Sequence, residues 1–142
     1  IAPLLVAGDC LLLSGDIGAG KSHFCRAVIL QRLLHVGLHE DVPSPTYTLV
    51  QTYDDTICDI WHADLYRLTD PQEVVELGLQ DAFDSAICLV EWPDRLAVDA
   101  PQNALSIHIA PTETDSARIL TFAAIGPYWE KLFPVLRSVA GE

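Results

Sequence analysis

A glycine-rich segment at residues 15–22 fits the pattern G-x-x-x-x-G-K-[S/T] at every position. Glycines let successive backbone N–H groups turn inward around a phosphate, where larger side chains would block the approach. The lysine adds a positive charge that reaches the β- and γ-phosphates, and the serine hydroxyl is suited to ligate a bridging Mg²⁺. We predict a phosphate-binding loop made of Gly15, Asp16, Ile17, Gly18, Ala19, Gly20, Lys21 and Ser22.

The flanks of this loop decide whether the pattern is meaningful. Cys10–Ser14 is a short apolar run typical of a buried parallel strand, and the residues from Ser22 to Leu34 include no Gly or Pro and can form a helix. The unpaired N–H groups and the positive dipole end of such a helix would face a bound phosphate. This context disfavours the alternative, a glycine-rich turn without a ligand.

A second apolar run, at residues 87–90, ends in one carboxylate, Glu91, and is soon cut off by a proline. It matches the acid-tipped strand that accompanies a phosphate loop, whose carboxylate holds Mg²⁺, often through water, or positions the attacking water. Trp92 is expected either to stack on the nucleotide or to be an ordinary aromatic of the core or its rim. We predict Lys21 and Glu91 as catalytic residues, and Ser22 and Glu91 as metal ligands.

Between these segments the pattern favours an antiparallel hairpin. A loop with two prolines precedes alternating residues from Thr46 to Tyr53, and alternation resumes from Ile57 to His62 after a short turn. A hydroxyl from Thr46 or Thr48 would approach Mg²⁺ or the γ-phosphate, as in a nucleotide-sensing switch, or would merely favour the strand. We predict Thr46 as a nucleotide contact.

Asp64 follows this hairpin among aromatic and basic neighbours. A carboxylate there can ligate metal or orient water; the alternative is a local salt bridge to Arg67. With a phosphate loop in the same small domain, we interpret Asp64 as a third catalytic residue. His62 is either a base or, more simply, a hydrogen-bonded histidine at the end of its strand.

The remaining elements complete the predicted fold. Asp70 and Pro71 begin a helix that stops at Gly78, a short second helix follows, and two strands near residues 105–109 and 118–122 form an edge hairpin. A last helix opens at Gly126-Pro127 and is interrupted by Pro134. The order predicts an α/β fold of the three-layer P-loop NTPase type, with a mostly parallel central sheet and antiparallel hairpin additions.

Composition limits the function classes. The net charge of −12, from 8 basic and 20 acidic residues, disfavours direct binding of nucleic acid. It would either attract a basic protein partner or merely keep the protein in solution. No apolar run approaches the length of a membrane span, so we expect a cytoplasmic protein with residues 1–142 in one domain, and we favour a monomer. Because no methionine is present, we expect that an N-terminal segment is missing, and residues 1–6 resemble the end of a helix.

The four cysteines lie far apart, with no C-x-x-C pair and no histidine at zinc-site spacing. Structural zinc is therefore not expected. Three cysteines fall in apolar runs that resemble strands, and Cys25 falls in the helix after the loop. We interpret all four as reduced thiols buried as small hydrophobic side chains.

The segments GDIGAGKS, SPTYTLV, HADLYRL, ELGL and LVEWP, in this order and spacing, resemble the TsaE (YjeE) family. This family is the bacterial ATPase required for threonylcarbamoyladenosine modification of tRNA. The resemblance runs from about Gly8 to Leu96, and residues after Pro101 match only in general character. Members usually have threonine where Ser22 stands, which keeps the hydroxyl, and they begin further upstream.

The resemblance implies a P-loop α/β fold that binds ATP or ADP with Mg²⁺, has weak ATPase activity alone and associates with the TsaB–TsaD heterodimer. It implies nucleotide contacts from the loop and Thr46, functional acids at Asp64 and Glu91, and Trp92 near the nucleotide. Two alternatives stay open: a nucleotide-gated binding module with incidental hydrolysis, and a P-loop kinase for a small metabolite. The kinase is disfavoured because the later half offers only widely spaced arginines for a lid.

Overall fold

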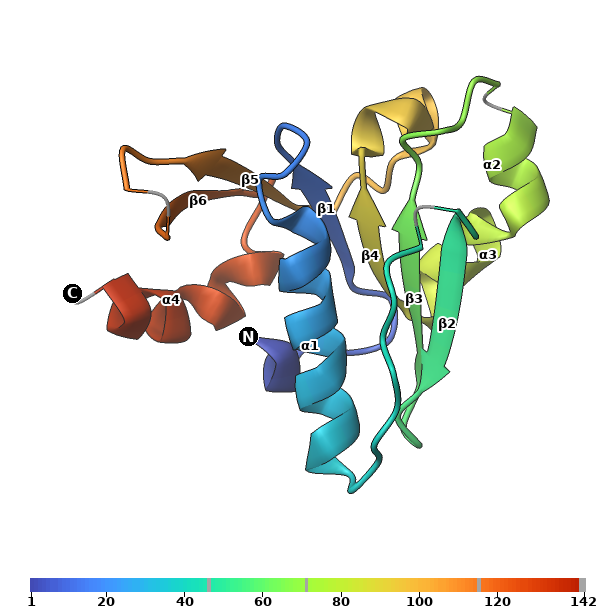
Figure 1. The fold of residues 1–142 in the computed structure, drawn as a ribbon. Coiled ribbons are helices and arrows are strands. Elements are labelled where there is room, and N and C mark those ends of the chain that lie inside the picture. Colours follow the sequence, from blue (N-terminus) through green and yellow to red (C-terminus); the bar gives the residue numbers. More distant parts are fainter. Residues whose placement is uncertain (46, 71, 115, 141–142) are drawn as a thin grey trace.

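A six-stranded sheet forms the centre of the protein in the computed structural model, which describes residues 1–45, 47–70, 72–114 and 116–140 (Figure 1). The strand order is β2-β3-β4-β1-β5-β6. The bounds are β1 Cys10–Ser14, β2 Val50–Asp54, β3 Asp59–Asp64, β4 Ile87–Glu91, β5 Leu105–Pro111 and β6 Arg118–Ala123. The four middle strands are parallel, and β2 and β6 are antiparallel edge strands. This arrangement confirms the predicted fold class.

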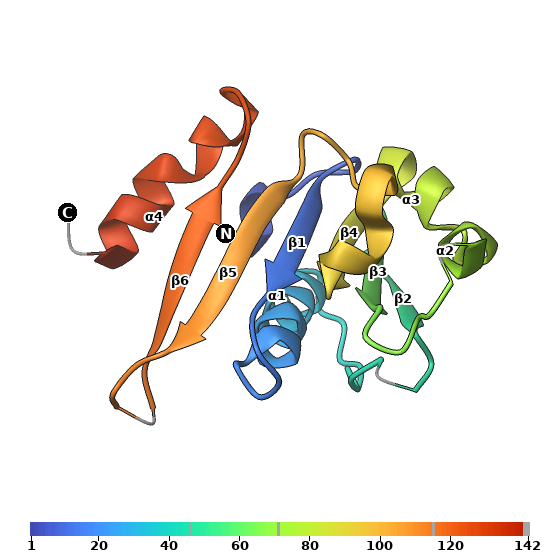
Figure 2. The ribbon, with the colours of Figure 1, turned by 90° about the horizontal axis from the view of Figure 1, so that it is seen from above.

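Helices cover both faces of the sheet, as Figure 2 shows with α1 on one side and α3 on the other. The α-helices are α1 Lys21–His35, α2 Gln72–Leu77, α3 Leu79–Ser85 and α4 Phe133–Ala140. The 3₁₀ helices are η1 Ala2–Leu4, η2 Pro93–Asp99 and η3 Tyr128–Leu132. None of the helices in the described ranges is long and apolar enough to cross a membrane.

Two apolar clusters form the core, one on each face of the sheet. Because strand side chains alternate, Leu11 and Leu13 pack in the cluster with α1, whereas Cys10 and Leu12 pack in the cluster with α2 and α3. A strand covered on both faces reads as an unbroken apolar run, which explains the sequences of β1 and β4. The carboxyl ends of β1, β3 and β4 therefore meet at one edge, where Asp64 pairs in register with Glu91.

A buried ion pair ties α1 to the turn between β2 and β3. The Arg32 guanidinium lies 2.6 Å from Asp55 Oδ2, and it also donates to the carbonyls of Ala2 and Leu5. Burial by itself raises the pKa of the Asp55 carboxyl, but hydrogen bonds from two backbone N–H groups in the turn and from Arg32 lower it overall. The pair fixes the end of α1 that lies far from the phosphate loop.

The structure corrects several predicted boundaries. The first hairpin strand begins at Val50 rather than Thr46, because residues 47–49 turn and Leu49 has a left-handed φ of 69°. The second begins at Asp59, so Cys58 lies half-buried in the turn and His62 lies inside the strand, not at its end. Thr46 and Pro71 lie outside the described residues.

Both chain ends also differ from the prediction. Residues 2–4 form a single 3₁₀ turn rather than the end of an α-helix. The segment after Gly126 first forms η3 and then α4, with Pro134 in the first turn of α4, where a missing N–H is tolerated. The start predicted near Asp70 is confirmed, because its carboxylate accepts the N–H of Gln72 at 2.9 Å.

Candidate functional site

The predicted phosphate loop connects β1 to α1, and its glycines occupy backbone conformations that side chains rarely adopt. Gly15 has φ 147°, and a Cβ there would lie 2.5 Å from the carbonyl oxygen of Ile109. Gly18 and Gly20 have φ 82° and 110°, and a Cβ at either would meet no atom of the described chain within 4 Å. The first glycine is thus required by close packing, whereas the other two border open space.

The N-terminus of α1 opens onto this space. Its N-cap residue, Gly20, provides no side-chain cap, so no side chain satisfies the first N–H groups of the helix there. Among the described residues, no backbone carbonyl accepts a hydrogen bond from the N–H of Gly18 or Gly20. Unpaired N–H groups at the positive end of a 15-residue helix suit an anion.

Lys21 is held against the loop itself. Its Nζ donates to the carbonyl oxygens of Gly15 at 2.7 Å and Asp16 at 2.9 Å, and it lies 4.3 Å from the centre of the Trp92 ring. Burial lowers the pKa of this ammonium group, and the carboxylates of Glu91, Asp64 and Asp16 oppose that effect. The lysine has donors that can be transferred from these carbonyls to a phosphate.

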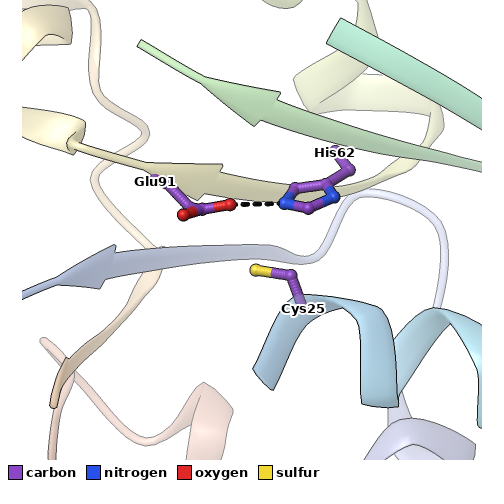
Figure 3. A group of neighbouring side chains, drawn as sticks. All are labelled: Cys25, His62 and Glu91. Carbon is purple, nitrogen blue, oxygen red and sulfur yellow. Dashed lines mark hydrogen bonds and ion pairs between the residues drawn. The ribbon is translucent and has the colours of Figure 1, made fainter. Parts of the chain in front are cut away.

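A hydroxyl, a carboxylate and an imidazole form a connected group beneath the loop. Ser22 Oγ donates to Glu91, with both carboxylate oxygens 2.8 Å away. His62 Nε2 lies 2.6 Å from Glu91 Oε2 (Figure 3). His62 is fully buried and Glu91 is 2% exposed, so α1, β3 and β4 meet at a water-poor polar cluster.

The hydrogen bonds of His62 indicate its tautomer. Its Nδ1 is buried and has no partner among the described residues. A proton on Nδ1 would leave a buried donor unpaired, so we assign the proton to Nε2, which donates it to Glu91. The neutral imidazole thereby fixes one oxygen of the carboxylate.

Asp64 lies at the end of β3 beside this cluster. It is 6% exposed, and its Oδ1 accepts the N–H of Tyr66 at 3.0 Å. A cleft of about 400 Å³ runs along this edge. It is lined by Ile17, Gly18, Gly20, Lys21, Ser22, His23, Arg26, Asp64, Tyr66, Glu91 and Trp92. The structure thus brings together Asp64, Glu91, Trp92 and the loop, as the sequence predicted, whereas Thr46 lies outside the described residues.

Two residues near the site, Arg26 and Arg118, were not predicted from the sequence, and two others, Cys25 and His62, were not predicted to lie beside Glu91. Arg26 lines the cleft one helical turn after Ser22, a spacing of four residues that the sequence does display. Arg118, on β6, donates through Nε to the carbonyl of Ala19 at 3.1 Å, and no local pattern indicates this contact. His62 lies beside Glu91 because of the register of β3 against β4, and Cys25 lies there because of the position of α1 on the sheet.

These features fit a nucleoside triphosphate with Mg²⁺. Open space beside two glycines, free N–H groups at a helix start and a nearby ammonium group match the shape and charge of phosphates. A hydroxyl oxygen and carboxylate oxygens are the ligands that Mg²⁺ prefers. The residues that would hold phosphate are Gly18, Gly20 and Lys21, and those that would hold the metal are Ser22 and Glu91.

Known proteins resemble this chain in sequence. A model of the family described as threonylcarbamoyl adenosine biosynthesis protein TsaE matches residues 1–120. The tRNA threonylcarbamoyladenosine biosynthesis protein TsaE of Bacillus subtilis is 36% identical over 126 residues, which are 88% of this chain and 75% of that protein. The protein of the same name from Rickettsia felis is 42% identical over 94 residues, 66% of this chain and 53% of that protein. The chain thus spans about half the length of the proteins of this name from Rickettsia felis and Rickettsia conorii.

A solved structure agrees with this likeness. The crystal structure of YdiB from Bacillus subtilis superposes with a TM-score of 0.75 at 31% sequence identity, covering 98% of this chain and 83% of that one. The family match over residues 1–120 and the matching fold agree with each other. The chain belongs to the TsaE family.

Proposed function

We propose that this protein binds ATP with Mg²⁺, hydrolyses it slowly, and acts in threonylcarbamoyladenosine modification of tRNA through a TsaB–TsaD-type complex. One observation carries the ATPase part of the proposal. The hydroxyl that follows the phosphate-loop lysine donates to both oxygens of Glu91, at the end of the neighbouring strand. This pairing leaves the lone pairs of Ser22 Oγ available to a cation, while its O–H group donates its hydrogen bond to the carboxylate.

Each residue of the site has a separate role in the proposed hydrolysis of ATP. Lys21 would exchange the carbonyls of Gly15 and Asp16 for phosphate oxygens. Ser22 would ligate the cation directly, and Glu91 would hold it through Ser22 or through water. Asp64, which borders the cleft, would orient the attacking water. When bound, Mg²⁺ would neutralise charge on the β- and γ-phosphates.

The scarcity of cations supports slow hydrolysis and a need for a partner. Lys21 and Arg26 are the cationic side chains lining the cleft among the described residues, and Arg118 contacts the back of the loop. An arginine finger supplied by a partner raises hydrolysis rates by about 10³–10⁵ in P-loop enzymes. A net charge of −12 suits action on tRNA through proteins that bind it.

The test is replacement of Lys21 by alanine, with replacement of the chain's other lysine, Lys131, as the matched control. Binding of a fluorescent ATP analogue and release of phosphate are measured with Mg²⁺ present. Lys21→Ala should abolish binding or hydrolysis, and Lys131→Ala should keep both. Unchanged values for Lys21→Ala would refute the proposed site.

A contact with the neighbouring loop favours a second candidate, a nucleotide-gated binding module. Ser44 Oγ lies 3.4 Å from Ser22 Oγ, so the segment leading into β2 touches the phosphate loop. Occupancy of the nucleotide site would then alter a surface to which a partner binds, and hydrolysis would not be needed for this function. Glu91→Gln separates the two candidates: if this variant binds ATP without hydrolysing it and still supports repeated cycles of tRNA modification, the gating function is favoured.

A further inference from the structure

Three side chains of different ligand types meet beneath the phosphate loop. They are the Cys25 thiol from α1, the His62 imidazole from β3 and the Glu91 carboxylate from β4 (Figure 3). One ligand atom from each lies within 4.8 Å of the other two, and all three residues are buried. Mg²⁺ takes oxygen ligands, whereas sulfur, nitrogen and oxygen together suit zinc and related metals.

We propose that Cys25, His62 and Glu91 form a site for one thiophilic divalent cation of the Zn²⁺ class, which shares Glu91 with the proposed Mg²⁺ site and adds a thiolate and an imidazole to it. Water or the Ser22 hydroxyl would complete a tetrahedron. From Zn–ligand bonds of roughly 2.0–2.3 Å, neighbouring ligand atoms should lie about 3.4–3.6 Å apart. The cluster therefore closes on a cation when the thiol moves inward by about 1 Å and the His62–Glu91 contact, now 2.6 Å, opens by a similar distance.

The charges balance when the cation is bound. Cys25 loses its thiol proton to solvent and contributes one negative charge, and Glu91 contributes the other. His62 stays neutral when its proton moves from Nε2 to Nδ1, which frees the Nε2 lone pair for the metal. This tautomer leaves a buried Nδ1–H donor without a partner among the described residues, a cost that the metal–nitrogen bond must offset. The dication with two anionic ligands and one neutral ligand carries no net charge, which suits a site buried between a helix and a sheet.

The ion has a route to this site through Glu91, which lines the cleft beside the phosphate loop. A cation bound to Cys25 and His62 is also bound by the Glu91 carboxylate. This carboxylate is the group that accepts the hydrogen bond from the Ser22 hydroxyl. Binding of the cation draws the Glu91 carboxylate toward Cys25 and His62 and away from Ser22, so occupancy by Zn²⁺ should weaken binding of Mg²⁺ with ATP. This consequence rests on the proposed function, whereas the site itself does not.

The test of the site uses Co²⁺ and Zn²⁺ on the nucleotide-free protein. Co²⁺ should give tetrahedral ligand-field bands with a thiolate-to-cobalt absorption, at one ion per chain, and Zn²⁺ should bleach both. Cys25→Ser should remove the thiolate absorption, while Cys58→Ser, which changes the half-buried cysteine outside the cluster, should keep it. Absence of the absorption in the wild-type protein, its persistence in Cys25→Ser or its loss in Cys58→Ser would overturn the proposal.

A second measurement needs no variant. X-ray absorption at the zinc edge of the wild-type protein should show one sulfur ligand with nitrogen and oxygen ligands, and a shell without sulfur would overturn the site. A third measurement compares binding of the ATP analogue with Mg²⁺ before and after one equivalent of Zn²⁺. A loss of about 10- to 100-fold is expected, the usual effect of removing a partner of a metal ligand. Unchanged binding by protein that carries Zn²⁺ on sulfur would overturn the competition but not the site.

Discussion

Replacing His62 by leucine removes one hydrogen bond from Glu91 without removing any group that lines the cleft. The Nε2–Oε2 distance is 2.6 Å, and both side chains are at most 3% exposed, so water cannot substitute for the imidazole. A hydrogen bond to a charged group contributes about 1.5–3 kcal/mol. Each 1.4 kcal/mol changes an equilibrium constant about tenfold, and loss of a residue that hydrogen-bonds to a metal ligand typically lowers metal affinity or activity about 10- to 100-fold. We therefore expect kcat/KM for ATP to fall about 10- to 100-fold.

The assay measures phosphate release while Mg²⁺ is varied, so that metal affinity and kcat are separated. His62→Leu should raise the Mg²⁺ concentration needed for half-maximal rate, because Ser22 is then the one remaining hydrogen-bond partner of the Glu91 side chain among the described residues. His62→Gln is the matched control, since its amide nitrogen reaches nearly the position of Nε2 and restores a donor. Wild-type Mg²⁺ dependence in His62→Leu, or equal losses in both variants that follow their melting temperatures, would refute this positioning role.

Three further predictions concern the loop, the core and the cleft. Gly15→Ala should lower the free energy of unfolding in urea by about 1–3 kcal/mol, because its Cβ would collide with the carbonyl oxygen of Ile109. Gly18→Ala is the contrast, because a Cβ there meets no described atom within 4 Å. This variant should mainly weaken nucleotide binding, measured by calorimetry. Asp55→Asn should lower stability at pH 7 by about 3 kcal/mol. The pKa of Asp55 is lower in the folded state than in the unfolded state. Its contribution to the free energy of unfolding is therefore present above the unfolded-state pKa of about 3.9 and is lost as the pH falls below that value. The stability of the variant should thus depend less on acid pH than that of the wild type. Trp92→Phe should abolish the fluorescence change on ATP binding, because Lys21 leaves this ring when it moves to phosphate; a full signal in the variant would contradict that movement.

Local patterns were enough to predict the order of elements around the phosphate loop. The apolar runs that became β1 and β4 and the uninterrupted helix that became α1 need only neighbouring residues for their identification. The predicted start of the first hairpin strand was wrong, because Leu49 has a left-handed backbone and β2 begins only after it. A period-two pattern carries no signal for such a turn.

The contents of the candidate site were predictable only in part. Glu91 was identified because it ends an apolar run, and Ser22 because it belongs to a spaced motif. The hydrogen bond between His62 and Glu91 depends on the register of β3 against β4, which pairs His62 with Leu89. Cys25 joins them through the position of α1 over the sheet. Contacts between residues 29 or more positions apart in sequence are set by packing, so a single sequence does not display them.

The pairing of β1 with strands from much later in the chain affects the order of events during synthesis. β1 is among the first elements made, yet its two neighbours in the sheet are β4 and β5, and Arg118 of β6 reaches back to the loop. A nascent chain that has just emerged with its glycine-rich segment therefore lacks the strands that shape it. Such long-range pairing slows folding and leaves apolar strands exposed meanwhile. The proposed affinity for nucleotide should thus arise late in translation, when β5 and β6 have left the ribosome.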